Sequence, residues 1–483
     1  MNYKMMGRFL STTLLLEALF MIPALLISFF SGESVSAESF TITIAIILAT
    51  GGALMLICKG APTAFGAREG FACVAISWIV LSLFGCLPFV ISRQIPNFID
   101  ALFETVSGFS TTGASILGDV ESLYKGNLYW RSFTHWVGGM GVLVFLLAFT
   151  PGNQGKGFTM HLLRAESPGP NVGKLVPKMR KTAAILYAIY LGLTVLNIIF
   201  LLFGEMPLLE AVCTAFGTAG TGGFGVYNDS MASCSPYIQN VTTVFMLLFG
   251  VNFTCYYWLL LREFKSVLKD EELRLYAGIV IASIIMLVLN LRGVYETLGE
   301  TIRHAAFQVA SIMTTTGFAT TDFDLWPAFS KGILMALMIV GACAGSTGGG
   351  IKVARVLLLF KSLQRNIRQV LRPNKVQVVR NNGQTVEERV LESTNAYLAA
   401  YIIIAVLSYI LISLDGFSIG TNLSAVLACF NNIGPGMEMV GPTCNYAIFS
   451  PLSKIILIID MLAGRLEIFP ILILLTRNTW KRQ

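Results

Sequence analysis

Long apolar stretches, each followed by a shorter polar segment, dominate this chain of 483 residues. A helical crossing of a bilayer needs roughly 20 apolar residues. Ten stretches come close to or exceed that length, and each is predicted to be a membrane-spanning helix. They cover residues 9–30, 39–58, 71–92, 131–150, 182–203, 237–261, 275–291, 331–361, 394–414 and 451–475. The pattern therefore predicts an all-α polytopic membrane protein whose termini lie on one side of the bilayer.

The composition excludes a soluble globular protein, because 55% of the residues are hydrophobic and only 13% are charged. An average soluble domain has about 25% charged residues. The net charge of +7 comes from Lys and Arg that lie between apolar stretches, so no nucleic-acid partner is expected. Most of the 34 Lys and Arg fall on the side of the termini, and the positive-inside rule therefore places both termini in the cytoplasm.

Four predicted external connections share a pattern, a short apolar stretch followed by a segment rich in Gly and Thr. They read ALFETVSGFSTTGAS from Ala101, AVCTAFGTAGTGGFG from Ala211, AAFQVASIMTTTGFA from Ala305 and NLSAVLACFNNIGPG from Asn422. They align on four glycines, with a small residue six positions before each: Ser107, Gly217, Ser311 and Ala428. The repeating unit is a span, a half-span, a Gly-containing segment and a second span.

Each half-span of about 11 residues would form a helix ~16 Å long, about half the thickness of the hydrocarbon core. It can enter the membrane only to turn back, and the returning strand must line a wet cavity or lie buried in protein. Four such strands around one axis would face one another with carbonyl oxygens, an arrangement that holds a dehydrated monovalent cation. The alternative interpretation is that the small residues only permit close helix packing.

The candidate cation ligands are the residues that lead up to and include the aligned glycines. They are Ser110, Thr111, Thr112, Gly113, Gly220, Thr221, Gly222, Gly223, Thr314, Thr315, Thr316, Gly317, Asn431, Asn432, Ile433 and Gly434. Glycine is suited to the strand because it adopts backbone angles that residues with a Cβ avoid, and Thr hydroxyls can add ligands.

A candidate gate follows the third of these segments. The predicted span 331–361 is rich in glycine, so a straight helix is not expected there, and a loop could project into the pore and obstruct it. Arg465 lies within the last apolar stretch, where an unpaired charge costs about 2.5–3.5 kcal/mol. The candidate gate residues are Gly345, Ser346, Thr347, Gly348, Gly349, Gly350, Lys352 and Arg465. The alternatives are a glycine packing face and a structural salt bridge from Arg465 to another helix.

The chain resembles the membrane subunits of the Trk/Ktr/HKT superfamily of potassium transporters. The motifs that carry the resemblance are TTTGF, RSFTHWVGGMGV from Arg131, GACAGSTGGGIKVAR from Gly341 and MLAGRLEIFP from Met461. The resemblance implies K⁺ as the transported ion, a complete pore in each monomer, and a homodimer in the bacterial inner membrane. It also implies docking on a cytosolic ring of TrkA-like regulatory subunits whose RCK domains bind the nucleotide, so no organic cofactor is expected in this chain.

Two features depart from fourfold symmetry and lead us to expect weaker selectivity than in tetrameric channels. Ile433 and Pro435 flank the glycine of the fourth segment, and Gly222 precedes the glycine of the second. The chain is therefore divided into five units. The first consists of the two N-terminal helices, and the other four are pore repeats, of which the third has an interrupted inner helix. Their boundaries are 1–65, 66–155, 156–265, 266–372 and 373–483.

Several alternatives accompany these predictions. A secondary transporter that couples K⁺ to H⁺ or Na⁺ is the second hypothesis for the function. The basic loops 151–181 and 352–393 would dock the regulatory ring, or only orient the protein and contact anionic lipid. No catalytic constellation indicates an enzyme. Cys234 and Cys444 fall in predicted external segments, where either a disulfide or two free thiols fits the sequence.

Overall fold

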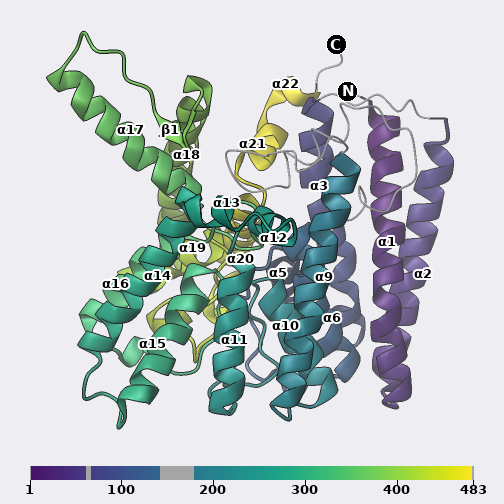
Figure 1. Cartoon of the computed structure of the whole chain (residues 1–483). Helices are drawn as coiled ribbons and strands as arrows, with labels where there is room; N and C mark the ends of the chain where they lie inside the picture. Colours follow the sequence, from purple (N-terminus) through teal and green to yellow (C-terminus); the bar gives the residue numbers. More distant parts are fainter. Residues whose placement is uncertain (1, 61–66, 142–178, 481–483) are drawn as a thin grey trace.

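The computed structural model describes residues 2–60, 67–141 and 179–480, and this part of the chain is a bundle of helices (Figure 1). Its only strands are β1 (Arg380–Asn381) and β2 (Gln384–Thr385), an antiparallel pair with Arg380 opposite Thr385. The helix α1 begins and the short helix α22 (Arg477–Trp480) ends at the same end of the bundle, where Tyr3 donates a hydrogen bond to the carbonyl of Trp480 over 3.2 Å.

Two N-terminal helices form a hairpin at one edge of the bundle (Figure 1). They are α1 (Tyr3–Phe30) and α2 (Ser34–Ile57), and the turn between them contains Gly32 at φ +73°. Both helices expose large apolar side chains such as Phe29 and Leu56, as expected for a surface that meets lipid.

Four helices lie at the start of the four predicted repeats. They are α3 (Ala67–Gly85), which continues into α4 (Leu87–Ile91), α9 (Met179–Phe203), α14 (Glu271–Asn290) and α18 (Glu388–Ile412). Among the described residues, six helices are long and apolar enough to cross a membrane, or seven if one bent pair counts as a single span. The remaining apolar stretches of the expected ten form shorter or broken helices, or continue beyond the described residues.

Four shorter helices occupy the predicted half-spans. They are α5 (Phe98–Phe109), α10 (Leu208–Ala219), α15 (Leu298–Met313) and α19 (Ile419–Phe430). Their first turns are capped where the sequence offers a cap: the side chains of Asn97, Thr297 and Ser418 accept hydrogen bonds from backbone N–H groups of α5, α15 and α19. We call these four the pore helices.

Two of the second helices are broken, and here the expectation of continuous spans 237–261 and 451–475 is corrected. The breaks separate α11 (Pro236–Phe249) from α12 (Phe253–Leu260), with a bend of 90°, and α20 (Pro451–Arg465) from α21 (Phe469–Leu475). The side chain of Asn252 caps α12, and Glu467 and Ile468 adopt φ values of +59° and +65°, which a helix cannot contain.

The other second helices are α6 (Lys125–Met140) and α16 (Ala328–Val340). The rest of the predicted span 131–150, after α6, lies outside the described residues. After α16, residues 341–352 are not helical, and α17 (Val353–Leu371) resumes in a new direction. Short connecting elements complete the fold: α13 (Phe264–Lys269), η1 (Phe323–Leu325), η2 (Ser413–Asp415), η3 (Glu438–Val440) and η4 (Tyr446–Ile448).

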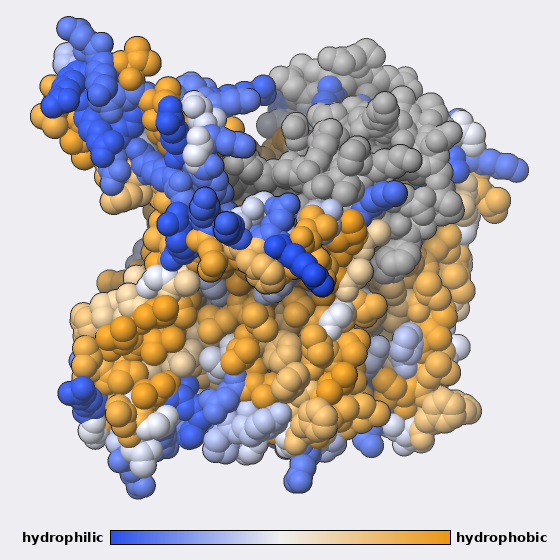
Figure 2. Space-filling view, viewed as in Figure 1, coloured by the Kyte–Doolittle hydropathy of each residue, from blue (hydrophilic) through white to orange (hydrophobic). Residues whose placement is uncertain are grey.

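The face of the molecule in Figure 2 carries a broad apolar band, with hydrophilic residues below it and over α17 above it. Beneath this band, a buried apolar cluster joins α1, α3, α5, α6 and α20 through side chains such as Trp78, Phe109 and Trp130. The helix α17 and the β1–β2 hairpin project from one end of the bundle (Figure 1). An apolar band of this kind, together with helices long enough to cross a bilayer, is typical of a membrane protein.

Candidate ion pathway

All four pore helices end in the same hydrogen-bonded motif. The N–H two residues after the C-cap donates to the carbonyl five residues earlier, which is the pattern of a Schellman cap. The pairs are Thr112 to Ser107, Gly222 to Gly217, Thr316 to Ser311 and Ile433 to Ala428, at 2.9, 2.8, 2.8 and 2.8 Å. The small residues that the sequence alignment placed six positions before each glycine are therefore the acceptors of these caps.

The residue that turns the chain out of each pore helix is not glycine, yet its backbone is left-handed. Thr111, Thr221, Thr315 and Asn432 have φ values of +55°, +52°, +59° and +55°. A β-branched residue in this region costs about 1–3 kcal/mol and persists only where its surroundings impose it. Four equivalent positions with this conformation indicate that the reversal of the chain is a shared structural requirement.

The four segments close into a ring. A Cβ built on Gly113 would lie 2.0 Å from the carbonyl oxygen of Gly222, and one on Gly223 would lie 1.9 Å from that of Thr316. A Cβ on Gly317 would lie 2.1 Å from the carbonyl oxygen of Ile433, and one on Gly434 would lie 2.7 Å from that of Thr112. Each repeat therefore touches the next, and the fourth returns to the first, so the chain brings the four segments around one axis.

Two side-chain oxygens at the left-handed positions are buried and have no hydrogen-bond partner among the described residues: Thr111 Oγ1 and Asn432 Oδ1. At the same position of the third segment, Thr315 Oγ1 accepts a hydrogen bond from Gly349. Buried oxygens without partners are costly unless they meet water or an ion. Together with the backbone carbonyls of the ring, they place several oxygen atoms near the ends of the pore helices.

The fourth segment is asymmetric, as its sequence indicates. The amide of Asn432 donates to Thr112 Oγ1 over 3.0 Å and to the carbonyl of Met461 over 2.9 Å, so it joins the first and fourth repeats. Asn431 and Tyr401 form a second polar contact, at 2.8 Å, behind this segment. At the position where the other three segments have a threonine hydroxyl, the fourth segment has the side-chain amide of Asn432. The four equivalent positions therefore differ in the polar groups that they offer to a ligand.

Residues 341–352 lie directly against the ends of two pore helices. The N–H of Gly349 donates to Thr315 Oγ1 over 2.6 Å, and a Cβ on Gly349 would lie 2.4 Å from the carbonyl oxygen of Asn431. A Cβ on Gly348 would lie 2.9 Å from the carbonyl oxygen of Thr314. The glycines allow the loop to reach the pore-helix ends more closely than side chains would permit.

The same loop is held from the other side by the break between α11 and α12. The N–H of Phe253 donates to the carbonyl of Gly345 over 3.0 Å, and the hydroxyl of Thr347 donates to the carbonyl of Phe249 over 3.3 Å. Ser346 bonds within the loop, to the carbonyl of Cys343, and the ammonium of Lys352 donates to the carbonyls of Gly348 and Gly349. The candidate gate residues thus form one cluster, with Gly350 at φ +69° at its end.

Arg465 joins this cluster from the C-terminal end of α20. Its guanidinium donates to the carbonyl of Thr347 over 2.8 Å, to that of Gly139 over 2.6 Å and to that of Gly138. Since Gly138 and Gly139 belong to α6, one side chain connects the loop to the inner helix of the first repeat.

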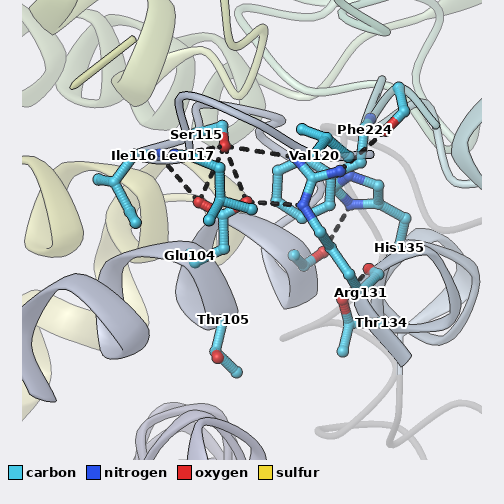
Figure 3. A network of polar contacts seen from close by, with 12 residues as sticks. Glu104, Thr105, Ser115, Ile116, Leu117, Val120, Arg131, Thr134, His135 and Phe224 are labelled. Carbon is cyan, nitrogen blue, oxygen red and sulfur yellow. Dashed lines mark hydrogen bonds and ion pairs between the residues drawn. The ribbon is translucent and has the colours of Figure 1, made fainter. Parts of the chain in front are cut away.

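A buried polar network that sequence reasoning missed lies behind the first two segments (Figure 3). Arg131 Nε and Glu104 Oε1 form an ion pair at 2.7 Å, and both side chains are almost fully buried. The same guanidinium donates to the carbonyl of Gly225 over 3.0 Å and lies 3.6 Å above the ring of Phe224. The sequence marks Arg131 only through the motif it begins, and nothing in its spacing indicates Glu104 as its partner.

His135 extends this network to the second segment. Its Nδ1 lies 2.8 Å from the carbonyl of Gly108, and its Nε2 accepts a hydrogen bond from the N–H of Phe224 at 3.3 Å (Figure 3). Because Nε2 is an acceptor, the imidazole is neutral with its proton on Nδ1. The network therefore connects the end of the first pore helix to the second Gly-containing segment and fixes their relative position.

We expect Glu104→Gln to destabilise the protein strongly. The amide keeps the shape of the side chain but leaves the Arg131 guanidinium buried without its counter-ion, which costs about 3–5 kcal/mol. Thermal unfolding of the purified protein in detergent should show a clear drop in Tm. Glu38→Gln, at an exposed carboxylate, is the control and should leave Tm unchanged. Equal Tm values for the two variants would contradict a stabilising role of the pair.

The outer end of the fourth repeat has its own support. Glu438 accepts hydrogen bonds from the hydroxyls of Ser418 and Thr421 and from the N–H of Thr421. These donors stabilise the carboxylate, so the pKa of Glu438 lies below its usual value. Its charge at the first turn of α19 also suits the positive end of the helix dipole.

Other predicted features are settled or fall outside the described residues. All nine cysteines, Cys234 and Cys444 included, are free thiols. Among residues 2–60, 67–141 and 179–480, no group of three or more His, Cys, Asp or Glu could hold a metal ion. Nearly all of the basic loop 151–181 lies outside the described residues, whereas 352–393 forms α17, the β1–β2 hairpin and the start of α18.

Comparisons with known proteins agree with this architecture. The family model TrkH, described as a cation transport protein, matches residues 36–481. The Trk system potassium uptake protein TrkH of Salmonella typhimurium is 36% identical over 455 residues, which cover 92% of this chain and 93% of the relative. TrkH of Halomonas elongata is 33% identical, with both chains covered completely. The crystal structure of the potassium transporter TrkH from Vibrio parahaemolyticus superimposes with a TM-score of 0.89 at 31% identity, again over the full length of both chains. This chain therefore belongs to the TrkH family of cation transport proteins.

Proposed function

We propose that this chain conducts K⁺ across the bacterial inner membrane through the ring formed by its four Gly-containing segments. The observation that carries the proposal is the closed succession of contacts from Gly113 through Gly223 and Gly317 to Gly434 and back. In a ring of carbonyls, the carbonyl oxygens replace the water oxygens that coordinate the ion, so the free energy of dehydrating K⁺ is largely compensated. The relatives named as potassium uptake proteins support K⁺ as the ion.

The pore helices contribute to the same task. Their C-terminal ends point to the ring, and the helix dipole places about half a negative charge at each of those ends. The unpartnered oxygens of Thr111 and Asn432 lie at these ends and offer further ligands to the partly hydrated ion. The cavity below the ring is therefore favourable for a cation and unfavourable for an anion.

The loop 341–352 acts as the gate in this proposal. It contacts the ends of α15 and α19, and Arg465 and Lys352 add two positive charges beside it. Passage of K⁺ would require the loop to move away from the pore-helix ends. Its glycines leave the backbone free to do so.

Regulation and assembly complete the proposal. Both termini face the cytoplasm, and α17 with the β1–β2 hairpin meets a cytosolic TrkA-like ring of RCK domains that binds the nucleotide. The basic character of this projecting segment, which includes Arg365, Arg368 and Arg372, supports its cytosolic placement. The complete ring within one chain fits a pore in each monomer, and two such monomers would form the homodimer.

A second candidate function is K⁺ transport coupled to H⁺ or Na⁺. Two buried carboxylates inside apolar helices favour it: Glu17 on α1, whose oxygens have no partner among the described residues, and Asp460 on α20, whose Oδ2 has none. Asp460 directly precedes Met461, whose carbonyl binds the amide of Asn432. A proton or a second ion at Asp460 would couple to the fourth segment through this contact.

Current recordings from the purified protein in planar bilayers separate the two functions. A channel reverses at the K⁺ equilibrium potential at every pH, whereas a coupled transporter shifts its zero-current potential when the H⁺ or Na⁺ gradient changes. We expect the first result, with Rb⁺ permeating nearly as well as K⁺ and Na⁺ and Li⁺ less well. Equal currents for K⁺ and Na⁺ would show that the ring is not suited to K⁺.

A further inference from the structure

The first turn of α14 holds a buried carboxylate that the proposed pathway does not use. Glu272 is only 8% exposed and belongs to the buried face of α14, together with Tyr276 and Val280. A buried carboxylate needs strong hydrogen-bond donors to remain charged. Its donors come from the segment between α16 and α17.

One oxygen of Glu272 bridges the two ends of that segment. Oε1 accepts a hydrogen bond from the N–H of Ala344 over 2.5 Å and another from the N–H of Ala354 over 3.1 Å. Ala344 lies near the start of the non-helical residues 341–352, and Ala354 lies in the first turn of α17. A single carboxylate therefore sets the separation between the entry and the exit of the loop.

The adjacent residue connects the same helix end to the projecting segment. Glu271 pairs with Lys361 of α17, and its Oε1 accepts a hydrogen bond from the N–H of Asn382, at the turn of the β1–β2 hairpin, over 3.1 Å. Asn382 returns two bonds, through its Oδ1 to the N–H of Glu271 over 2.9 Å and through its Nδ2 to Asp270 over 2.9 Å. Residues 270–272 therefore hold the hairpin on one side and the loop on the other.

We propose that Glu272 is a latch that keeps the loop 341–352 against the ends of α15 and α19, and that Glu271 ties this latch to the β1–β2 hairpin. The proposal rests on the proposed function, because it assigns a positioning residue to the gate. A displacement of the hairpin would pull on the end of α14 through Asn382 and Lys361. The two bonds from Ala344 and Ala354 to Glu272 would then weaken together and release the loop.

Single-channel recording of Glu272→Gln tests the latch. An amide oxygen accepts both N–H groups more weakly than a charged carboxylate, and the amide nitrogen cannot accept them at all. We expect about a tenfold rise in the ratio of open to closed time, with unchanged unitary conductance and K⁺/Na⁺ permeability ratio. Glu263→Gln is the matched control. This exposed carboxylate lies at the same end of the bundle, and within the described residues it accepts a hydrogen bond only from Ser266.

The possible outcomes separate the latch from the channel. An absence of K⁺ current in the unmodified protein would overturn the proposed function itself. Normal K⁺ current with the same open probability in Glu272→Gln and Glu263→Gln would overturn only the latch. Glu272→Asp, which keeps the charge but is one methylene shorter, should also raise the open probability because it cannot reach both N–H groups. If neither Glu272 variant folds, the carboxylate serves folding rather than a movable loop, and the proposal fails.

Discussion

Replacing Gly317 with alanine is expected to reduce K⁺ flux to about one hundredth of its normal value or less. Gly317 has φ +89°, and a Cβ there would lie 2.1 Å from the carbonyl oxygen of Ile433 and 2.9 Å from Cδ of Pro435. The backbone cost of about 1–2 kcal/mol and an overlap cost of similar size together approach 3 kcal/mol, a factor of about a hundred. Because the fourth segment must move to make room, the carbonyl ring loses its geometry. ⁸⁶Rb⁺ uptake into proteoliposomes measures the effect.

Two glycines of the third repeat provide matched controls. Gly293 has φ +84° but open space around its Cβ position, so Gly293→Ala carries the backbone cost without the overlap. Gly299 lies within α15 with open space and ordinary helical angles, so Gly299→Ala carries neither. Both should conduct normally. Normal uptake by Gly317→Ala, with a similar amount of protein in the membrane, would show that this ring does not carry the ion.

The sequence predicts the four pore helices and the segments after them because that part of the fold depends on local pattern. Four aligned glycines with a small residue six positions before each are visible without a structure, and the structure brings those segments together. The close approach of each glycine to the next repeat explains why glycine recurs. The role of these residues in binding K⁺ stays a prediction.

The left-handed backbone of Thr111, Thr221 and Thr315 could not be predicted from residue type, whereas Asn432 is of a type that tolerates it. Threonine disfavours this conformation, and only the cap at the end of each pore helix, together with the contacts between repeats, imposes it. Local preference and tertiary structure conflict at these three threonines. Such a conflict is expected at functional positions rather than elsewhere.

Two helix breaks inside apolar stretches could not be predicted from the sequence, whereas the glycines of residues 341–352 indicated the third. Residues 250–252 lie in a window as apolar as a continuous span, and the contacts that hold this break come from elsewhere in the chain. The N–H of Phe253, for example, bonds to the carbonyl of Gly345, about 90 residues away in sequence. The ion pair of Arg131 with Glu104 and the bonds of Glu272 to the loop are equally non-local. Periodicity and composition hold no information about such partners.

Replacing Arg465 with alanine is expected to raise K⁺ flux by roughly thirtyfold. The guanidinium lies beside the loop and donates to the carbonyls of Thr347, Gly138 and Gly139. A unit positive charge about 8 Å from a passing K⁺ repels it by about 2 kcal/mol at an effective dielectric constant of about 20. Removing it lowers this barrier and also frees the loop from α6, so both effects act in the same direction.

The variant Arg465→Lys separates the charge from the tether. An ammonium keeps the repulsion but is a compact point charge that cannot reach three carbonyls in the fork geometry of a guanidinium. If the charge forms the barrier, Arg465→Lys should stay within about threefold of the unmodified protein, whereas a large increase would show that the tether holds the gate closed. Arg372→Ala, at an exposed position after α17, is the control for loss of a positive charge at this end of the bundle. Slower uptake by Arg465→Ala, with normal expression and normal Tm, would mean that the guanidinium assists passage and would contradict the barrier role.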